Sequence, residues 1–388
     1  MAEFRNDAGS LAGSTQKNVE GVDIMGAMLV TGGAGFIGTN FIYYWLKNHP
    51  EDKIIILDAL TYAGNRHSLE DAEKQDNCTF VHGDILDQEL VEKLLIDHQI
   101  QTIVHFAAES HVDRSILGPD AFINTNIVGT HTLLKAAKKM WIDGNVENHR
   151  FHHISTDEVY GTLTPDEPPF VETNAYLPNS PYAASKASSD HLIRAYHETY
   201  GLKTTISNCS NNYGPFQFPE KLIPLIIVNI LDNKPLPIYG DGCQIRDWLY
   251  VDDHNFGVDL ILHKGTPGET YNIGGNNEWK NIDIIRHVCD LLDQQFKGDA
   301  GLKKRFPDSP AAKGQSSQSL ITFVKDRAGH DRRYAINPAK ISAAIGFSPR
   351  ETFPSGIEKT LTWFLSNEKW WRNIMDNTYR NWISSNYV

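Results

Sequence analysis

The sequence has few cysteines and no long hydrophobic run. Its four cysteines, at positions 78, 209, 243 and 289, form neither a CxxC pair nor a zinc-binding spacing among the 388 residues. We therefore expect free thiols, a cytoplasmic location and no metal site. The longest apolar stretch, Leu222 to Leu231, is interrupted by Pro224 and Asn229, far short of the roughly 18 residues that a membrane span needs. The pattern excludes a membrane protein.

Basic residues are also scarce, with 36 Lys and Arg against 48 Asp and Glu, for a net charge of -12. This balance disfavours nonspecific binding to nucleic acid, because neutralising phosphates takes clustered Lys and Arg. An anionic small ligand would need a local basic pocket. Residues 1–24 lack the apolar segment of a signal peptide, so we interpret them as a polar extension or tag.

The order of apolar patterns predicts an α/β fold, a doubly wound parallel Rossmann-type sheet with a smaller C-terminal α/β substrate domain. Residues 25–210 form the predicted NAD-binding domain, with strands at 28–31, 53–57, 79–82, 102–106, 151–155 and 204–207 and helices at 36–47, 87–97, 120–139 and 182–200. Residues 211–388 mainly form the nucleotide-sugar-binding domain. The chain returns to the first layer near 245–265, as a strand at 248–251 and a helix at 252–263. The polar segment 297–319 is predicted to be a surface excursion.

A glycine-rich turn follows the first predicted strand. Gly32, Gly35 and Gly38 have the spacing at which a dinucleotide pyrophosphate approaches a helix N-terminus. Asp58 ends the next strand, 20 residues after Gly38, where a carboxylate binds ribose hydroxyls and repels a 2'-phosphate. NAD is therefore favoured over NADP, unless the loop of Arg66 folds back. A buried glycine turn with a surface aspartate is the alternative.

A second group of residues has the composition of a catalytic site. Tyr182 and Lys186 are four residues apart in a predicted helix, so they share a face, and we expect the ammonium to lower the pKa of the phenol. Thr156, Asp157 and Glu158 follow a central strand, at the edge where doubly wound sheets place their chemistry. Solvated loop carboxylates are the alternative interpretation of the acid pair.

Together these residues carry a family resemblance from about residue 28 to residue 371. The segments that resemble family signatures are, in order, TGGAGFIG, DALTYAGN, HFAAESHVDRS, NTNIVGT, HHISTDEVYG, YAASKASSDH, NCSNNYGP, FPEKLIPL, QIRDWLYVDDH, YNIGG and DRAGHDRRYAI. The chain resembles the extended short-chain dehydrogenase/reductase superfamily and, within it, the dTDP-glucose 4,6-dehydratases. The Asp-Glu pair after the threonine is the discriminating element, which related epimerases, decarboxylases and mannose-type dehydratases typically lack.

The resemblance implies a hydro-lyase that converts dTDP-glucose to dTDP-4-keto-6-deoxyglucose. The sugar is oxidised at C4, loses water across C5 and C6, and receives the hydride back from NADH at C6. By the same resemblance, Tyr182 is the base at the 4-hydroxyl, Lys186 tunes it, and Thr156 binds the C4 oxygen. Glu158 removes the C5 proton and Asp157 protonates the departing C6 hydroxyl, so Asp157 should be protonated at the start.

The resemblance also implies two sets of contacts. The NAD contacts are Gly32, Gly35, Phe36, Ile37, Gly38, Asp58, Ala59, Leu60, Thr61, Asp84, Ile85, Phe106, Ala107, Ala108, Glu109, Thr125, Tyr182, Lys186 and Asn212. The nucleotide-sugar contacts are Ser110, Thr156, Asn211, Lys221, Leu222, Pro237, Ile238, Tyr239, Arg246, Asn281, Asp326, Arg327 and His330. Two departures from the family are Ala59, usually Lys, and Ala328, usually Pro.

Several alternatives stay open from the sequence. Two alternatives are enzymes: a UDP- or CDP-glucose 4,6-dehydratase and, ranking lower, a nucleotide-sugar epimerase. A third alternative, from another class, is a noncatalytic NAD-binding scaffold. Arg246 beside Asp247 could be a surface ion pair. Adjacent His152 and His153 should point to opposite strand faces, which disfavours a metal pair. The resemblance further implies a homodimer, with helices 120–139 and 182–200 at its interface.

Overall fold

Seven parallel strands form the central sheet of the protein, for which a computed structural model describes residues 26–326 and 329–375. Their order across the sheet is β10-β6-β5-β4-β1-β2-β3, and each neighbouring pair is parallel. The strands are β1 (Ala27–Thr31), β2 (Lys53–Asp58), β3 (Cys78–His82), β4 (Ile100–His105), β5 (Arg150–Thr156), β6 (Thr204–Cys209) and β10 (Thr270–Ile273). The six predicted strands are all present, and β10 was not predicted.

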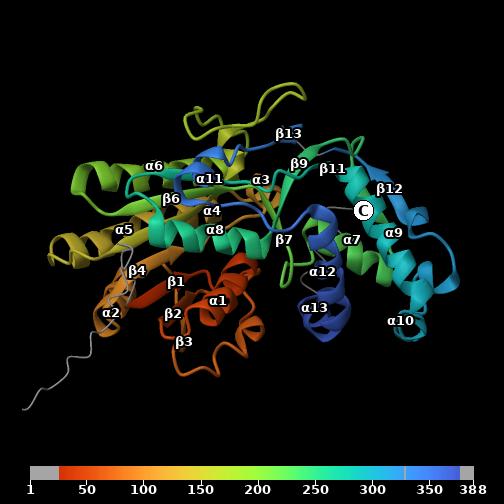
Figure 1. The fold of residues 1–388 in the computed structure, drawn as a ribbon, viewed down its shortest axis with the longest axis horizontal. Coiled ribbons are helices and arrows are strands. Elements are labelled where there is room, and N and C mark those ends of the chain that lie inside the picture. Colours follow the sequence, from red (N-terminus) through yellow and green to blue (C-terminus); the bar gives the residue numbers. More distant parts are fainter. Residues whose placement is uncertain (1–25, 327–328, 376–388) are drawn as a thin grey trace, which may run out of the picture.

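Helices cover both faces of this sheet (Figure 1). One face carries α1 (Phe36–Asn48), α8 (Val251–Lys264) and α11 (Ala339–Ile345), and the other carries α2 (Gln88–Asp97), α5 (Thr130–Ala137) and α6 (Pro181–Tyr200). Along β1, Met28 and Val30 enter the first of these cores and Leu29 the second, because successive strand residues point to opposite faces. The predicted doubly wound α/β fold is confirmed.

The predicted helix at 120–139 is a series of four helical segments. These are α4 (Asp120–Phe122), the π-helical segment η2 (Ile123–Gly129), α5, and the π-helical segment η3 (Lys138–Ile142). Short helices elsewhere are α3 (Val112–Leu117), η1 (Arg66–Leu69) and η4 (Asp157–Tyr160). Hydrophobic periodicity does not distinguish a π-helical turn from an α-helical one, so the sequence gives no sign of these turns.

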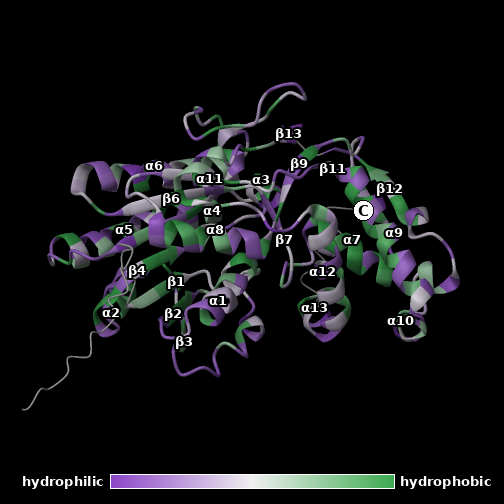
Figure 2. Cartoon of the chain, viewed as in Figure 1, coloured by the Kyte–Doolittle hydropathy of each residue, from purple (hydrophilic) through white to green (hydrophobic). Residues whose placement is uncertain are grey.

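The remaining elements build a second core, on the right in Figure 1. β11 (Glu278–Lys280), β9 (Ile245–Tyr250) and β13 (Arg333–Tyr334) lie in that order, with β7 (Asn211–Tyr213) paired to β9; β8 (Leu236–Tyr239) pairs with β12 (Ile321–Val324). The helices are α7 (Leu222–Leu231), α9 (Asn281–Gly298), α10 (Ala300–Arg305), α12 (Phe353–Ser366) and α13 (Glu368–Ile374), with short turns η5 (Ala311–Lys313) and η6 (Ser317–Leu320). Figure 2 shows the apolar character of α7, whose residues are all buried except Leu222.

Two expectations for this half need correction. The strand expected at 248–251 exists as β9, but it pairs with β7, β11 and β13 rather than with the central sheet, whereas α8 packs on α1 as a helix of the first layer should. The segment 297–319 is not simply a surface excursion, because it forms α10 and buries Leu302, Phe306 and Ala311 in the second core. The proposed domain boundary near residue 210 stays a prediction.

The described residues bear on two expectations, the absence of a membrane-spanning helix and the free state of the cysteines. None of the helices they form combines the length and the apolarity that crossing a bilayer would take. All four cysteines are free, with Cys78, Cys209 and Cys289 buried.

Candidate active site

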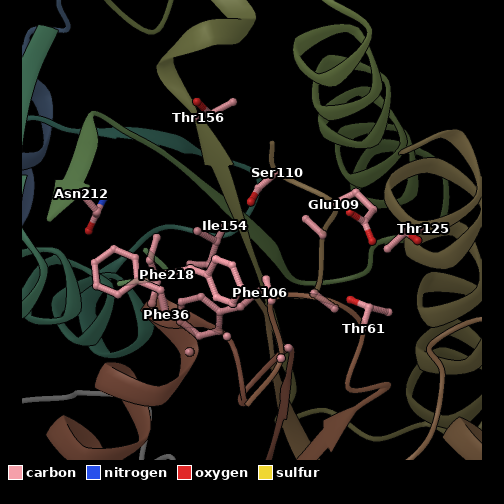
Figure 3. A pocket seen from close by; sticks show the side chains of 18 of the residues that line it. Phe36, Thr61, Phe106, Glu109, Ser110, Thr125, Ile154, Thr156, Asn212 and Phe218 are labelled. Atoms are coloured by element: carbon pink, nitrogen blue, oxygen red, sulfur yellow. The ribbon is translucent and has the colours of Figure 1, made fainter. Parts of the chain in front are cut away.

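A cavity of about 310 Å³ opens at the carboxyl ends of the central strands (Figure 3). Residues that end or directly follow the strands β1 to β6 line it, so six strand ends converge on one space. In Figure 3 the rings of Phe36, Phe106 and Phe218 lie together on one side, while Thr156 and Ser110 lie beyond them. This edge of a doubly wound sheet is where ligands bind, because the strand order reverses there.

The predicted cofactor contacts all line this cavity except Leu60. Leu60 has a left-handed backbone with a φ of 51°, and its side chain packs against the core between the sheet and α1, α8 and α11. Its amide donates to Asp58 Oδ1 at 2.7 Å. Further lining residues, which the sequence did not single out, are Leu57, Tyr62, Ala63, Gly64, Gly83, Ile154, Ser155, Cys209, Ser210, Gln217, Phe218 and Glu220.

The glycine turn fits a dinucleotide. Gly32 has a φ of 71°, and a Cβ there would lie 2.5 Å from the backbone nitrogen of Ala107; a Cβ on Gly38 would lie 2.4 Å from the carbonyl oxygen of Gly32. A Cβ on Gly35 would meet only that same oxygen, at 3.3 Å, so this glycine leaves space in front of the helix. Gly35 is the N-cap of α1 and has no side chain to occupy the first amides, which suits an anion such as a pyrophosphate.

Asp58 holds this turn from the end of β2. Its Oδ2 accepts a hydrogen bond from the Ala34 amide at 2.9 Å, and its burial raises the pKa of the carboxyl group. The concern that Arg66 would fold back over this site is not supported. Arg66 is exposed, forms a double hydrogen bond with Glu73 and stacks on Phe80 at 4.6 Å. A carboxylate at this position, with no arginine folded over it, fits the ribose hydroxyls of NAD.

The acid pair lies where β5 ends and η4 begins. Thr156 is the N-cap of η4: its hydroxyl accepts from the Glu158 amide at 3.3 Å and donates to Asp157 Oδ1 at 3.3 Å. Asp157 is almost fully buried, and its Oδ2 has no hydrogen-bond partner among the described residues. Burial, with the nearby charge of Glu158, raises the pKa of Asp157 well above its usual value. The interpretation of both acids as solvated loop residues is thus wrong for Asp157.

Tyr182 and Lys186 share one buried face of α6, as the sequence predicted. The helix starts at Ser180, whose side chain accepts from the Ala183 amide at 3.1 Å. The predicted lowering of the Tyr182 pKa is wrong for the protein alone: burial, and then the charge of Glu158, raise it well above its usual value. Lys186 does not offset this rise: its ammonium donates to the Ile154 carbonyl at 2.8 Å, and its own burial lowers its pKa to about 8.

A buried polar cluster lies behind Lys186. His153 Nε2 is 3.2 Å from Lys186 Nζ and 3.3 Å from Asp190 Oδ1, while the Ser155 hydroxyl donates to Asp190 Oδ2 at 2.8 Å. His152 instead contacts the side chains of β6, 2.9 Å from the Thr205 hydroxyl. The two histidines therefore point to opposite faces, as predicted, and form no metal pair with each other.

A π-helical turn supports one wall of the cavity. Asn126, in η2, donates to the Glu109 carbonyl at 3.0 Å and accepts from the Glu109 amide at 2.8 Å. Its amide also donates to Ser185 on α6 at 2.8 Å. Asn126 thereby fixes the segment after β4 to the helix that carries Tyr182. Its chain neighbour Thr125 lines the cavity.

The predicted nucleotide-sugar contacts divide into two groups. Ser110, Thr156, Asn211 and Lys221 line the cavity. Leu222, Pro237, Ile238, Tyr239, Arg246, Asn281, Asp326 and His330 do not, and Arg327 lies outside the described residues, as does Ala328. Part of this second group is nevertheless clustered: His330 Nδ1 is 2.6 Å from Asp326 Oδ1, and its ring lies edge-on to Tyr239 with centroids 5.9 Å apart.

Arg246 is buried, and the surface ion pair with Asp247 is wrong. Asp247 instead accepts backbone amides of the segment after β10, at 2.9 Å from Gly275 and 2.6 Å from Asn277. The Arg246 guanidinium lies over the Tyr334 ring at 4.2 Å. The positive charge of Arg246 lowers the pKa of Asp157 and partly opposes the effect of burial, so Arg246 acts electrostatically on the acid pair.

Tyr62 and Glu220 line the cavity with Arg114 beside them, and no site role was predicted for these three residues although each lies in a segment that resembles a family signature. The Arg114 guanidinium lies 3.8 Å from the Tyr62 ring centroid, and its NH2 is 3.3 Å from a carboxylate oxygen of the buried Glu220. Tyr62 and Glu220 come from loops without periodicity, and folding alone brings them to one cavity.

Comparisons with known proteins agree with this geometry. A model of the GDP-mannose 4,6 dehydratase family matches residues 29–360. A dTDP-glucose 4,6-dehydratase of Escherichia coli K12 is 53% identical over 371 residues, covering 93% of this chain and 98% of that protein. Among solved structures, a dTDP-glucose 4,6-dehydratase of Streptomyces venezuelae with NAD bound has a TM-score of 0.78 at 44% identity, covering 90% of this chain and 99% of that one. Another, from Bacillus anthracis in complex with NAD, has a TM-score of 0.77 at 42% identity, with the same coverage.

Proposed function

The chain belongs to the family of the dTDP-glucose 4,6-dehydratases, and from this premise we propose how its residues perform the reaction. It is an NAD-dependent hydro-lyase that converts dTDP-glucose to dTDP-4-keto-6-deoxyglucose. The observation that carries the proposal is the convergence on one cavity of the glycine turn, the buried acid pair and the Tyr182-Lys186 face.

The glycine turn and Asp58 would hold NAD. Gly35 leaves the first amides of α1 open to the pyrophosphate, and the Asp58 carboxylate would bind the ribose at the adenosine end, next to Ala59, which stands where the family usually has Lys. Bound NAD would supply a reversible oxidation, in which the hydride taken from C4 is returned at C6. A carboxylate at the end of β2 favours NAD over its 2'-phosphorylated form, since the two anions would repel each other.

Tyr182, in its phenolate form, takes the proton of the 4-hydroxyl as C4 is oxidised. Thr156 supports this step, because its hydroxyl is among the influences that lower the pKa of Tyr182 against the effect of burial. Lys186, one helical turn away, keeps its ammonium charge below about pH 8 and favours the phenolate as it forms.

The acid pair then removes water. Oxidation at C4 acidifies the C5 proton, and the Glu158 carboxylate takes it. Asp157, whose protonated form is favoured by burial and by the charge of Glu158, gives its proton to the C6 hydroxyl, which leaves as water. Two neighbouring carboxyl groups with opposite starting protonation thus divide the roles of acid and base.

Replacing Glu158 by Gln tests the assignment. The variant should oxidise dTDP-glucose and accumulate reduced nicotinamide, seen by its near-ultraviolet absorbance, without releasing 4-keto-6-deoxy product. In deuterated water the unchanged protein should yield product with one deuterium at C5, and the variant none. Glu198→Gln, an exposed change on α6, is the matched control and should turn over normally. Normal turnover by Glu158→Gln would exclude Glu158 as the base.

Competition experiments test the substrate. UDP-glucose and CDP-glucose should compete poorly with dTDP-glucose; equal turnover would favour the alternative nucleotide. Inversion at C4 without water loss would indicate an epimerase. Absence of any reaction, with NAD supplied, would support the noncatalytic scaffold.

We further propose a cytoplasmic homodimer. Four free thiols support a reducing compartment. Ile123 and Val128, on the predicted interface helix, are 47% and 43% exposed although apolar, which supports contact with a second copy through this helix and α6. Sedimentation of the full chain should give a dimer that Val128→Asp weakens; a monomer at micromolar concentration would contradict the proposal.

A further inference from the structure

A cluster of two histidines and an aspartate lies outside the cavity, where the end of α1 meets α8. His49 caps the carboxyl-terminal end of α1, and Asp259 and His263 are one turn apart on α8. The two helices lie side by side on the same face of the sheet (Figure 1). The cluster therefore joins segments that are about 210 residues apart in the sequence.

The three side chains are already close to the geometry of metal ligands. Asp259 Oδ1 lies 2.8 Å from His263 Nδ1 and 3.2 Å from His49 Nε2, and the three candidate ligand atoms lie within 4.8 Å of one another. A tetrahedral zinc ion with bonds of about 2.0 to 2.1 Å places neighbouring ligand atoms roughly 3.3 Å apart. Small movements would thus open the space that an ion needs.

Neighbouring residues hold these side chains in position. The Tyr44 hydroxyl donates to Asp259 Oδ2 at 2.9 Å, which leaves Oδ1 directed at the two imidazoles. The His49 ring stacks on Trp45 at 4.1 Å, and the two imidazole rings are stacked with centroids 5.1 Å apart. Hydrogen bonds to the outer atoms of metal ligands commonly orient them in this way.

The cluster is partly sheltered yet reachable from solvent. The side chains of His49, Asp259 and His263 are 25%, 15% and 33% exposed. Burial would by itself raise the pKa of Asp259, but its hydrogen bond from His263 and the nearby His49 lower it, so the carboxylate is ionised at neutral pH. An ionised carboxylate is the form that binds a cation.

We propose that His49, Asp259 and His263 form a binding site for a divalent transition ion of the zinc class, which ties α1 to α8. Two imidazole nitrogens and one carboxylate oxygen suit zinc, whereas magnesium and calcium prefer an all-oxygen set. Three protein ligands leave one position for water. The site lies apart from the catalytic cavity and does not depend on the proposed reaction.

The test uses the full chain, freed of metal with a chelator and titrated with zinc chloride by calorimetry. One equivalent should bind, and saturating zinc should raise the midpoint of thermal unfolding. His49→Gln and His263→Gln remove one ligand each while keeping polar side chains, and each should weaken binding more than about 100-fold and abolish the thermal shift. Tyr44→Phe, which removes only the orienting hydroxyl, should weaken binding about 10- to 100-fold.

His67→Gln provides the matched control, because His67 pairs with Glu70 on an exposed turn away from the cluster. It should bind zinc as the unchanged chain does. Absence of zinc binding in the unchanged chain would overturn the proposal, and so would binding of equal strength in His49→Gln and His263→Gln. In either case the cluster would be held together by a shared proton alone.

Discussion

Replacing Asp190 by Asn should move the pH dependence of catalysis. Asp190 and Lys186 both contact His153 Nε2, at 3.3 Å and 3.2 Å, so the carboxylate oxygen and the ammonium nitrogen lie within 6.5 Å. Burial lowers the pKa of Lys186 to about 8, and the charge of Asp190 opposes this by raising it. The variant keeps the shape of the side chain and removes the charge.

The magnitude follows from that separation. At an effective dielectric constant of about 20, two unit charges at this upper limit of separation attract by about 2.5 kcal/mol, which is therefore a lower bound on the attraction. Losing this attraction lowers the pKa of the ammonium by about two pH units, since each unit corresponds to about 1.4 kcal/mol. Lys186 is charged below its pKa and neutral above it, so the alkaline loss of activity should shift from about pH 8 to about pH 6. At about pH 7.5 the charged fraction then falls roughly 20-fold.

The assay is kcat/KM for dTDP-glucose from about pH 5.5 to about pH 9.5, because this ratio reports ionisations of the free enzyme. Asp253→Asn is the control: Asp253 is a buried carboxylate that accepts backbone amides from Arg350 and Glu351, away from the cavity. It should lower thermal stability without moving the profile. An Asp190→Asn profile that coincides with that of the unchanged chain would refute the coupling.

Four further predictions concern other parts of the chain. Asp157→Asn should slow water loss more than C4 oxidation, which rapid-mixing absorbance and product mass can separate; equal slowing of both steps would count against an acid role. Gly32→Ala should lower the free energy of unfolding by about 2 kcal/mol or more, because it places a Cβ on a left-handed backbone and against the backbone of Ala107. Gly35→Ala should fold and bind NAD more weakly, and thermal unfolding with NAD titration distinguishes the two. Deletion of residues 1–24 should leave kcat unchanged, and a loss of activity would show that this segment has a function.

The sequence predicted the central strands well because their signal is local. β1, β2 and β4 are largely apolar runs, as strands buried on both faces often are. β3, β5 and β6 mix apolar and β-branched residues with polar ones, and β-branched residues favour strands. β10 has only four residues, and its place at the edge of the sheet depends on pairing with β6, which no local pattern reports. Because no local pattern reports strand pairing, the prediction that β9 belongs to the central sheet was also wrong.

The site divides in the same manner. The spacing of Gly32, Gly35 and Gly38, and of Tyr182 and Lys186, can be seen in the sequence, because each set lies on one turn or one helix. The wall made by Tyr62 and Glu220 could not be predicted, since loops far apart in the sequence form it. The direction of the Tyr182 pKa was predicted wrongly, because adjacency to Lys186 is visible in the sequence and burial is not.

The sequence by itself determined the order of strands and helices, the glycine turn and the identity of the acid pair, since all of these rest on residue type and short spacing. Tertiary structure decided which groups are buried together: it placed Asp157 in an environment that raises its pKa, turned Lys186 toward His153, and brought His49 to Asp259 and His263. The physical reason is that protonation and ligand geometry depend on desolvation and on charges within a few ångströms. Only packing of distant segments sets these.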